Sequence, residues 1–167
     1  LSGDAPKTTE PQKEEEKAFE GRAGAMVALK VNTGEVLGLA SAPSFDPNKF
    51  SKGIASEEWS GLMQDKKLPM LNRAVQSQYP PGSTFKIITA IAGLEEGTLT
   101  DETSVTCRGG INFGKWHFGC WKKTGHNTVT LHRAIVESCD VYFYEAGKRL
   151  GIDRIHDYAT RFGLGKE

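Results

Sequence analysis

A serine and a lysine three residues apart are the residues in this chain best suited to chemistry. Ser83 and Lys86 stand in the string Ser-Thr-Phe-Lys, directly behind Tyr79-Pro80-Pro81-Gly82. On an α-helix this spacing places both side chains on one face, within reach of each other. A serine hydroxyl attacks an acyl carbon readily only when a neighbouring base takes its proton. The pair therefore predicts a serine nucleophile with Lys86 as its general base.

The surrounding segment predicts a buried helix that begins at the serine. Pro80 and Pro81 end the preceding element and Gly82 allows a sharp turn, so Ser83 falls at the helix N-terminus. Free backbone N–H groups and the helix dipole favour negative charge there, including an oxyanion. Burial would also favour a neutral lysine, because it disfavours the charged form. Apolar residues are spread around the whole circumference of the expected helix: Phe85, Ile87, Ile88, Ile91, Ala92 and Leu94.

The wider string, from Asn72-Arg73-Ala74 to Tyr-Pro-Pro-Gly-Ser-Thr-Phe-Lys, resembles the active-site segment of the class B penicillin-binding proteins. These proteins are the D,D-transpeptidases that cross-link peptidoglycan, and the resemblance is to the penicillin-binding protein 2 type. It runs from about Gly24 to Glu167. It implies an α+β fold of the penicillin-binding protein/serine β-lactamase-like class, in which an antiparallel sheet packs with helices and the nucleophile lies on a buried helix.

A second motif, Ser138-Cys139-Asp140, resembles the S-x-N element of the same family in an S-x-D form. In the family this serine lies on a loop between two helices and relays a proton to the leaving group. The apolar spacing before and after the motif is typical of two such helices. Asp140 departs from the family pattern, because an amide can donate a hydrogen bond to substrate and an ionised carboxylate cannot. Its role is either substrate contact or capping of the following helix.

The triplet Lys123-Thr124-Gly125 matches the third family element, K-T-G, in letters only. In the family that element follows the S-x-N motif on a strand that lines the site. Here the triplet precedes Ser138 and lies among loop-forming residues. Only 29 residues follow Ser138, too few for the rest of a transpeptidase domain. We therefore expect an incomplete fragment of the domain, with the true K-T-G strand beyond Glu167.

Three cysteines and a histidine form a candidate metal site. Cys107 and Cys120 flank a glycine-rich segment that predicts a hairpin, His126 follows it, and Cys139 lies inside the second motif. Three thiols and an imidazole are a complete tetrahedral set for structural zinc. The resemblance points the same way, since some penicillin-binding protein 2 relatives have a metal site in this stretch. The alternative is a Cys107–Cys120 disulfide, with Cys139 a free buried thiol, which an oxidising periplasm would favour.

Composition and chain organisation are those of an ordinary globular protein. Hydrophobic residues make up 38% of the chain and the net charge is zero, which gives no reason to expect nucleic acid. Residues 1–23 are polar, which predicts a linker or frayed helix before a transpeptidase domain that occupies residues 24–167. The sequence shows no secretory signal and no run of 18 apolar residues. The resemblance implies an upstream transmembrane anchor and a location at the periplasmic face of the bacterial inner membrane.

Two elements can be predicted early in the expected domain. Apolar runs at 25–31 and 35–41 surround Asn32-Thr33-Gly34, which predicts a β-hairpin that matches the first two strands of the transpeptidase sheet. A helix is predicted to begin at Ser56-Glu57-Glu58-Trp59, with Leu62 and Met63 on its inner side.

The resemblance implies the reaction of the parent enzyme. Ser83 would attack the penultimate D-alanine carbonyl of a peptidoglycan stem peptide while Lys86 takes its proton. Ser138 would help to protonate the departing D-alanine, and an amine of a second stem peptide would resolve the acyl-enzyme. β-Lactam antibiotics would acylate Ser83, and this chemistry needs no cofactor.

Other functions stay open at this point. A membrane glycosyltransferase of the elongation machinery is the partner that the resemblance implies. A serine β-lactamase or D,D-carboxypeptidase has the same serine and lysine, and a non-catalytic β-lactam sensor would bind the drug without turnover. The chain could also be an inactive fragment.

Overall fold

The computed structural model describes residues 17–51 and 53–165. The predicted linker therefore falls mostly outside the described residues. Two compact units are present, divided along the chain between Tyr79 and Pro80. None of the helices in the described ranges is long and apolar enough to cross a membrane.

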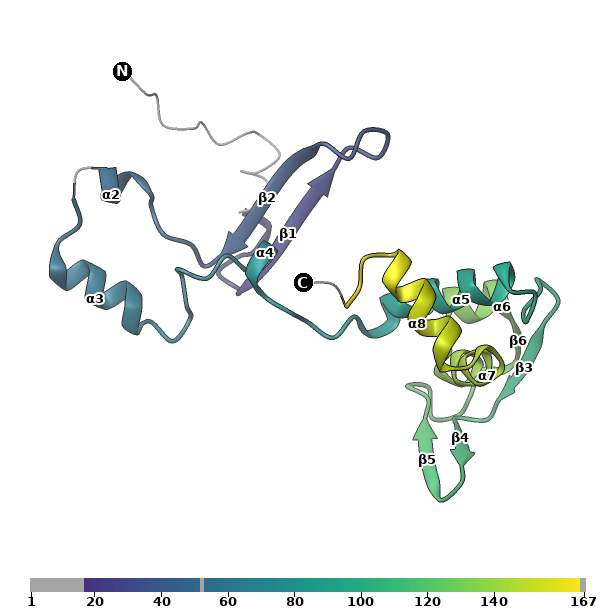
Figure 1. Ribbon diagram of the computed structural model, residues 1–167. Helices are drawn as coiled ribbons and strands as arrows, with labels where there is room; N and C mark the ends of the chain where they lie inside the picture. The colour runs from purple at the N-terminus through teal and green to yellow at the C-terminus, as the bar shows by residue number, and fades with distance from the viewer. Residues whose placement is uncertain (1–16, 52, 166–167) are drawn as a thin grey trace. The chain divides into compact units, whose positions relative to one another are not determined.

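An antiparallel hairpin forms the centre of the first unit. Its strands are β1 (Gly24–Leu29) and β2 (Val36–Ala42), drawn as paired arrows in Figure 1. The register places the first residue of β1 opposite the last residue of β2. Gly34 makes the turn possible, because it adopts a φ of 72° and its N–H donates to the Lys30 carbonyl at 2.8 Å. The predicted hairpin is confirmed.

Among the described residues, the first unit also contains helices α2 (Asn48–Ser51), α3 (Ser56–Gln64) and α4 (Arg73–Gln76). The start of α3 agrees with the prediction. The prediction that Met63 lies on an inner side of this helix is wrong. Met63 is 56% exposed, and no residue of α3 is fully buried. The Asn72 side chain caps α4 by accepting a hydrogen bond from a backbone N–H of the first turn.

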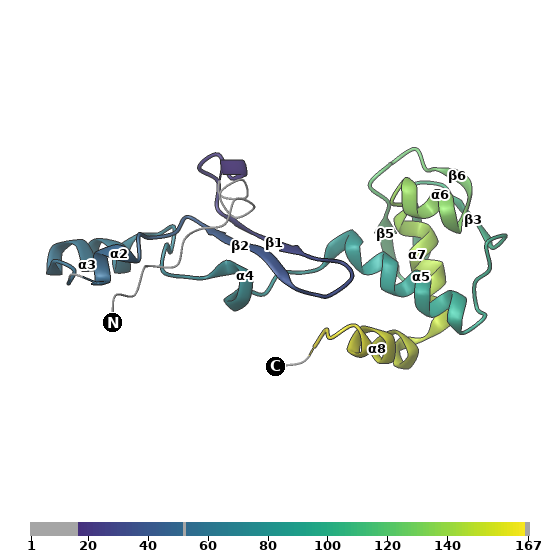
Figure 2. The same ribbon diagram turned by 90° about the horizontal axis from the view of Figure 1, so that it is seen from above.

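The second unit is helical and carries all the candidate chemistry. Its helices are α5 (Phe85–Glu95), α6 (Leu131–Val136), α7 (Asp140–Leu150) and α8 (Ile152–Arg161). Helix α5 packs against α7 and α8, as the two views in Figures 1 and 2 show. Helix α7 stops at Gly151, whose φ of 80° suits glycine, and α8 begins directly after it.

Two pairs of short antiparallel strands lie in the same unit. Strand β3 (Ser104–Cys107) pairs with β6 (Asn127–Thr130), and β4 (Gly110–Phe113) pairs with β5 (Trp116–Gly119). The β4–β5 hairpin confirms the prediction made for the segment between Cys107 and Cys120. Helices combined with antiparallel strands give the α+β class that was expected.

The core of the second unit consists of two groups of buried side chains. The larger group surrounds Tyr142 on α7, which is fully buried and donates from its hydroxyl to the Thr103 carbonyl at 3.1 Å. The smaller group joins α5 to α8 through Ile88, Ala92 and Tyr158. Helix α5 is thereby held by its neighbours, so the residues at its N-terminal end have a fixed support.

The prediction that α5 is buried all around is wrong. Ile87 is 54% exposed and Leu94 is 43% exposed, whereas Ile88 and Ala92 are buried. The covered side is the stripe that faces α7 and α8, and the opposite side is open among the described residues. The number of apolar residues on a helix does not reveal which of its faces are covered by other elements.

Candidate active site

Ser83 lies at the entrance to α5, in a 3₁₀ turn formed by Gly82–Thr84. The sequence placed it on the α-helix itself. The turn tightens because the Thr84 N–H donates to the Pro81 carbonyl at 3.3 Å and Gly82 adopts a φ of 55°. The Ser83 side chain is exposed, so its hydroxyl is open to an acyl donor.

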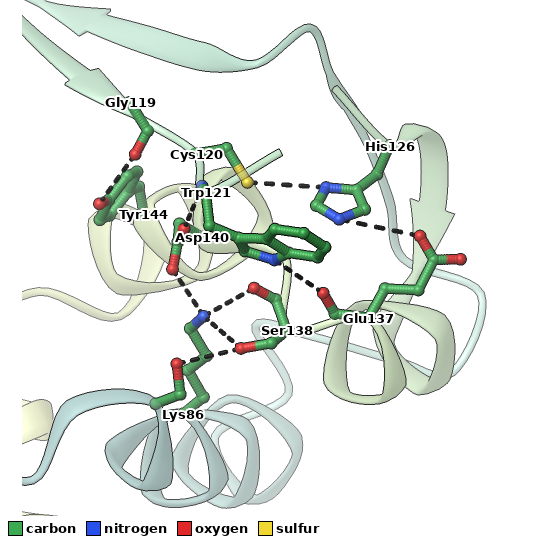
Figure 3. Close-up of polar contacts among 10 residues, drawn as sticks. Lys86, Gly119, Cys120, Trp121, His126, Glu137, Ser138, Asp140 and Tyr144 are labelled. Atoms are coloured by element: carbon green, nitrogen blue, oxygen red, sulfur yellow. Dashed lines mark hydrogen bonds and ion pairs between the residues drawn. The ribbon is translucent and has the colours of Figure 1, made fainter. Parts of the chain in front are cut away.

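Ser138 joins Ser83 to Lys86. The Ser138 hydroxyl donates to Ser83 Oγ at 3.0 Å and accepts from Lys86 Nζ at 2.9 Å. Lys86 Nζ also donates to the Ser138 carbonyl at 2.8 Å, as Figure 3 shows. The structure thus brings together the three residues that the two motifs supply, and the serine of the second motif lies between the other two.

Asp140 completes the surroundings of Lys86. Its Oδ1 lies 2.6 Å from Lys86 Nζ, and the two side chains are only 23% and 14% exposed. Burial by itself raises the pKa of Asp140, but hydrogen bonds from Lys86 and from the Trp121 backbone outweigh this, so its pKa lies below the usual value. Lys86 Nζ therefore faces three acceptors, which matches the three N–H bonds of an ammonium group.

Asp140 is not the cap of α7. It is the first residue of that helix, Cys139 is the N-cap, and the Asp140 carboxylate bonds elsewhere. Its Oδ2 accepts from the Trp121 backbone N–H at 3.0 Å, so each oxygen has its own donor. An asparagine would present its NH₂ group to one of these donors. The contacts therefore explain why a carboxylate can stand where the family pattern has an amide.

Ser138 has a strained backbone. It lies on the connection between α6 and α7, as expected, with a φ of 50° that is uncommon for a residue other than glycine. Its N–H donates to the Ile135 carbonyl at 3.1 Å, and the next N–H donates to the Ala134 carbonyl at 2.9 Å. These bonds hold the strained residue in place and aim its hydroxyl at Ser83.

Trp121 contributes to the site although no sequence signal marked it. Its side chain is 62% exposed, yet its indole N–H donates to the Glu137 carbonyl at 3.0 Å. Its backbone N–H holds Asp140, and both contacts can be followed in Figure 3. Trp121 therefore links the β5–β6 loop to the residues on both sides of Ser138. Only its position next to Cys120 could have drawn attention to it.

The cysteines and histidine of the candidate metal site come together in the second unit. We call Cys107, Cys120, His126 and Cys139 the thiol–imidazole cluster. All four are buried, no disulfide joins the cysteines, and their ligand atoms lie within 4.8 Å of one another. Ligands of a tetrahedral zinc ion with ~2.3 Å Zn–S bonds are about 3.8 Å apart, so the cluster has the size of a metal site.

The acid–base properties of the cluster also fit a metal site. Burial raises the pKa of Cys107, but hydrogen bonds from the Gly109 backbone and from His126 outweigh it and lower the pKa to about 7. Burial raises the pKa of Cys139 well above its ordinary value. A fully buried thiol with a raised pKa becomes a thiolate only if a cation compensates its charge. Three thiols packed around one imidazole are the donor set that zinc prefers.

The triplet Lys123-Thr124-Gly125 lies in the loop between β5 and β6, as predicted, and not on a strand. Gly125 has a φ of 78°, and a Cβ there would lie 2.2 Å from the Cys107 carbonyl oxygen. The glycine is thus required by the close approach of two backbone segments near the cluster. The glycine of the triplet is therefore explained by local packing, and the triplet is not needed as a K-T-G element to account for it.

The chain is similar to known proteins over most of its length. The family model described as "Penicillin binding protein transpeptidase domain" matches residues 24–167. The peptidoglycan D,D-transpeptidase MrdA of Acinetobacter baumannii is 44% identical over 149 residues, which is 88% of this chain and 22% of that protein. The chain thus spans about a quarter of the length of the curated relatives it matches.

Solved structures give the same result. Pseudomonas aeruginosa PBP2, in complex with WCK 5153, aligns with a TM-score of 0.88 and 39% identity, over 93% of this chain and 34% of that chain. Helicobacter pylori PBP2, in complex with MreC, aligns with a TM-score of 0.87 and 37% identity, over 93% and 29%. The expected family and fold are confirmed, and the chain belongs to the penicillin-binding protein transpeptidase family.

Proposed function

We propose that this chain is the part of a peptidoglycan D,D-transpeptidase that carries its nucleophile. The observation that supports this most directly is the connected set Ser83, Ser138, Lys86 and Asp140 at the start of α5 and α7. Ser83 Oγ attacks the penultimate D-alanine carbonyl of a stem peptide and forms an acyl-enzyme. An amine of a second stem peptide then takes the acyl group. A β-lactam acylates the same hydroxyl.

Ser138 contacts both Ser83 and Lys86, so it takes the proton of Ser83 and passes its own hydroxyl proton to neutral Lys86. The ammonium group formed in this step has three acceptors around it, the Ser138 carbonyl, the Ser138 hydroxyl and Asp140. Asp140 lies 2.6 Å away and keeps the charged lysine in place between turnovers. Ser138 is also placed to return a proton to the departing D-alanine.

The Ser83 backbone N–H, at the start of α5, supplies one donor for the oxyanion of the tetrahedral intermediate. In this family the second donor comes from the strand of the K-T-G element. The triplet at 123–125 lies in a loop, so we assign that role to a strand of the longer protein. The Ser83 side of the site is then complete, and the opposite wall is added by the rest of the domain.

The thiol–imidazole cluster is proposed to bind one structural zinc ion through Cys107, Cys120, His126 and Cys139. Its burial and its fit to four ligands support this. The ion supplies charge compensation for buried thiolates and a cross-link between three segments of the chain. Four protein ligands leave no open position, so the acyl transfer is carried out by the serines, the lysine and the carboxylate alone.

The proposal extends to the location and the partners of the longer protein. We propose that the longer protein acts at the periplasmic face of the bacterial inner membrane, with stem peptides as substrates and a membrane glycosyltransferase of the elongation machinery as its partner. The complex of Helicobacter pylori PBP2 with MreC supports a role within a larger assembly.

The transpeptidase proposal is tested with a protein of the relatives' length that contains this chain. We expect it to release D-alanine from a D-alanyl-D-alanine peptide and to form a cross-linked product in the presence of an acceptor amine. Ser83→Ala should abolish both, while Ser104→Ala, at the exposed first residue of β3, should leave them unchanged. Product formation by Ser83→Ala would refute the proposed nucleophile. Release of D-alanine with water as the only acceptor would indicate a carboxypeptidase.

The zinc proposal is tested on protein prepared without chelator. Elemental analysis should find about one zinc per chain, and X-ray absorption should give Zn–S distances near ~2.3 Å. Cys120→Ser should lower the melting temperature, because metal binding and folding are coupled. Absence of metal, together with a titration of one free thiol per chain in place of three, would refute the site and establish the disulfide.

A further inference from the structure

The two nitrogens of His126 face different surroundings. Its side chain is buried, with Nδ1 3.6 Å from Cys120 Sγ and Nε2 3.8 Å from a carboxylate oxygen of Glu137, as drawn in Figure 3. Nε2 is completely buried and has no hydrogen-bond partner among the described residues. A buried ring nitrogen without a partner is costly, so its environment needs an explanation.

The chemistry of the imidazole ring explains the two different environments of the His126 nitrogens. A neutral imidazole has one N–H donor and one acceptor nitrogen, and a metal binds the acceptor. Nδ1 points towards the sulfur atoms, which leaves Nε2 to carry the hydrogen. Histidine ligands usually donate their second N–H to a carboxylate or carbonyl, which fixes the ring and raises its basicity. Glu137 is the carboxylate that faces this nitrogen.

We propose that Glu137 is the positioning residue of the thiol–imidazole cluster: it accepts the Nε2–H bond of His126 and thereby makes Nδ1 the nitrogen that binds the metal. This inference rests on the zinc site proposed above, and it adds a residue that the ligand set does not contain. The two atoms are 3.8 Å apart, so the proposed bond requires the Glu137 carboxylate to move closer to His126 when the metal binds.

The neighbours of Glu137 prepare it for this role. Arg133, one turn earlier, donates to Oε1 at 2.5 Å, which leaves Oε2 for His126. The Trp121 ring packs edge-on against His126 with centroids 5.4 Å apart, while its indole N–H holds the Glu137 carbonyl. The imidazole and its carboxylate partner are therefore fixed from two sides.

Because of its position in the chain, the contact between Glu137 and His126 also bears on the catalytic loop. Glu137 directly precedes Ser138, whose backbone is strained and whose hydroxyl contacts Ser83. The side chain of Glu137 supports a metal ligand while its peptide group leads into the catalytic loop. The hydrogen bond thus connects the metal site to the position of Ser138.

The first test measures zinc release from the 167-residue chain to a chromophoric chelator. Glu137→Ala should release zinc about 10–100-fold faster than the unaltered chain. Glu137→Gln should be slower than Glu137→Ala, because its amide oxygen can accept the same bond. Arg133→Ala is the comparison variant: it removes the guanidinium that orients Glu137 but keeps the carboxylate that faces His126, so its zinc release should be clearly slower than that of Glu137→Ala.

The second test identifies the ligand nitrogen by NMR of zinc-loaded chain with ¹⁵N-labelled histidine rings. We expect His126 to show metal on Nδ1 and a slowly exchanging hydrogen on Nε2, which Glu137→Ala should make exchange faster. A merely structural effect of Glu137 would change neither the tautomer nor this exchange.

The outcomes separate this inference from the zinc site. Absence of zinc in the unaltered chain would overturn both. Zinc that is bound but released at the same rate by Glu137→Ala would overturn only the role of Glu137. The role of Glu137 would also be overturned if Arg133→Ala released zinc as fast as Glu137→Ala, or if Glu137→Gln released it as fast as Glu137→Ala. It would likewise be overturned if the NMR spectrum placed the metal on Nε2.

Discussion

Ser138 connects Ser83, the proposed nucleophile, with Lys86, the proposed base, through one hydroxyl. Ser83 and Lys86 both contact its Oγ, at 3.0 and 2.9 Å. The i, i+3 spacing brings the two side chains to the same side of the chain, but their connection depends on a residue more than fifty positions later. The motif Ser-x-x-Lys therefore contains only two of the three residues of the proposed proton path.

Removing the Ser138 hydroxyl should slow acylation strongly and should change the stability of the protein little. We predict that Ser138→Ala lowers the acylation rate of the longer protein by about 10²–10⁴-fold, the usual range for a lost proton-transfer group. The rate can be measured by stopped flow with a fluorescent penicillin, with Ser104→Ala as control. An unchanged rate for Ser138→Ala, in a protein with an unchanged melting temperature, would show that Ser83 loses its proton by another route.

Tyr142 should give the chain a pH-dependent stability at alkaline pH. Burial raises the pKa of Tyr142, whereas in the unfolded chain it titrates near ~10. Its contribution is therefore complete below about pH 10 and is lost as the pH rises towards its folded-state pKa, because only the unfolded state ionises there. Tyr142→Phe should show a flatter loss of stability above pH 10.

Denaturant unfolding between pH 8 and pH 11 measures this difference. Tyr142→Phe should also cost about 0.5–1.5 kcal/mol at neutral pH, because it loses the hydrogen bond to Thr103. Tyr79→Phe, at an exposed tyrosine, is the control. Parallel pH curves for the unaltered chain and for Tyr142→Phe would contradict the prediction.

At the scale of elements, the loop between β5 and β6 brings two backbone segments into contact. Gly125 and Gly109 approach each other here, and a Cβ on Gly109 would lie 2.0 Å from the Lys123 carbonyl oxygen. This packing brings Cys120 and His126 towards Cys107. The loop thus shapes the thiol–imidazole cluster as much as the strands do.

Two glycines with similar backbone conformations allow the packing to be tested. Gly114→Ala, at a φ of 56° with no atom near its Cβ, should cost about 1–2 kcal/mol for the left-handed backbone alone. Gly125→Ala should cost clearly more, because its Cβ would also collide with the Cys107 carbonyl. The comparison needs only the free energies of unfolding. Equal values for the two variants would mean that the loop relaxes without cost.

Local patterns predicted the elements well and their contacts poorly. The β1–β2 and β4–β5 hairpins and the loop at Ser138 follow from short runs of residues, so the sequence was sufficient. The contacts of Trp121 with Asp140 and of Glu137 with His126 join residues 11–19 positions apart and depend on how the elements pack. No periodicity contains that information. The open face of α5 was missed for the same reason.

The whole chain covers 22% of one curated relative and 34% of one solved relative, and we propose that it forms only one wall of the active site. We predict that the 167-residue chain reacts with a fluorescent penicillin about 10²–10³-fold more slowly than a protein of the relatives' length, the usual effect of a missing oxyanion donor. The two second-order rate constants can be compared directly. Equal rates would mean that the loop at 123–125 supplies the missing wall.

Ser83 is the residue that we propose to be acylated. The most direct measurement is peptide mapping by mass spectrometry after reaction of the longer protein with benzylpenicillin. We expect a single penicilloyl adduct on the peptide that contains Ser83, and none in Ser83→Ala. An adduct on Ser138 or on any other residue, or undiminished labelling of Ser83→Ala, would contradict this proposal.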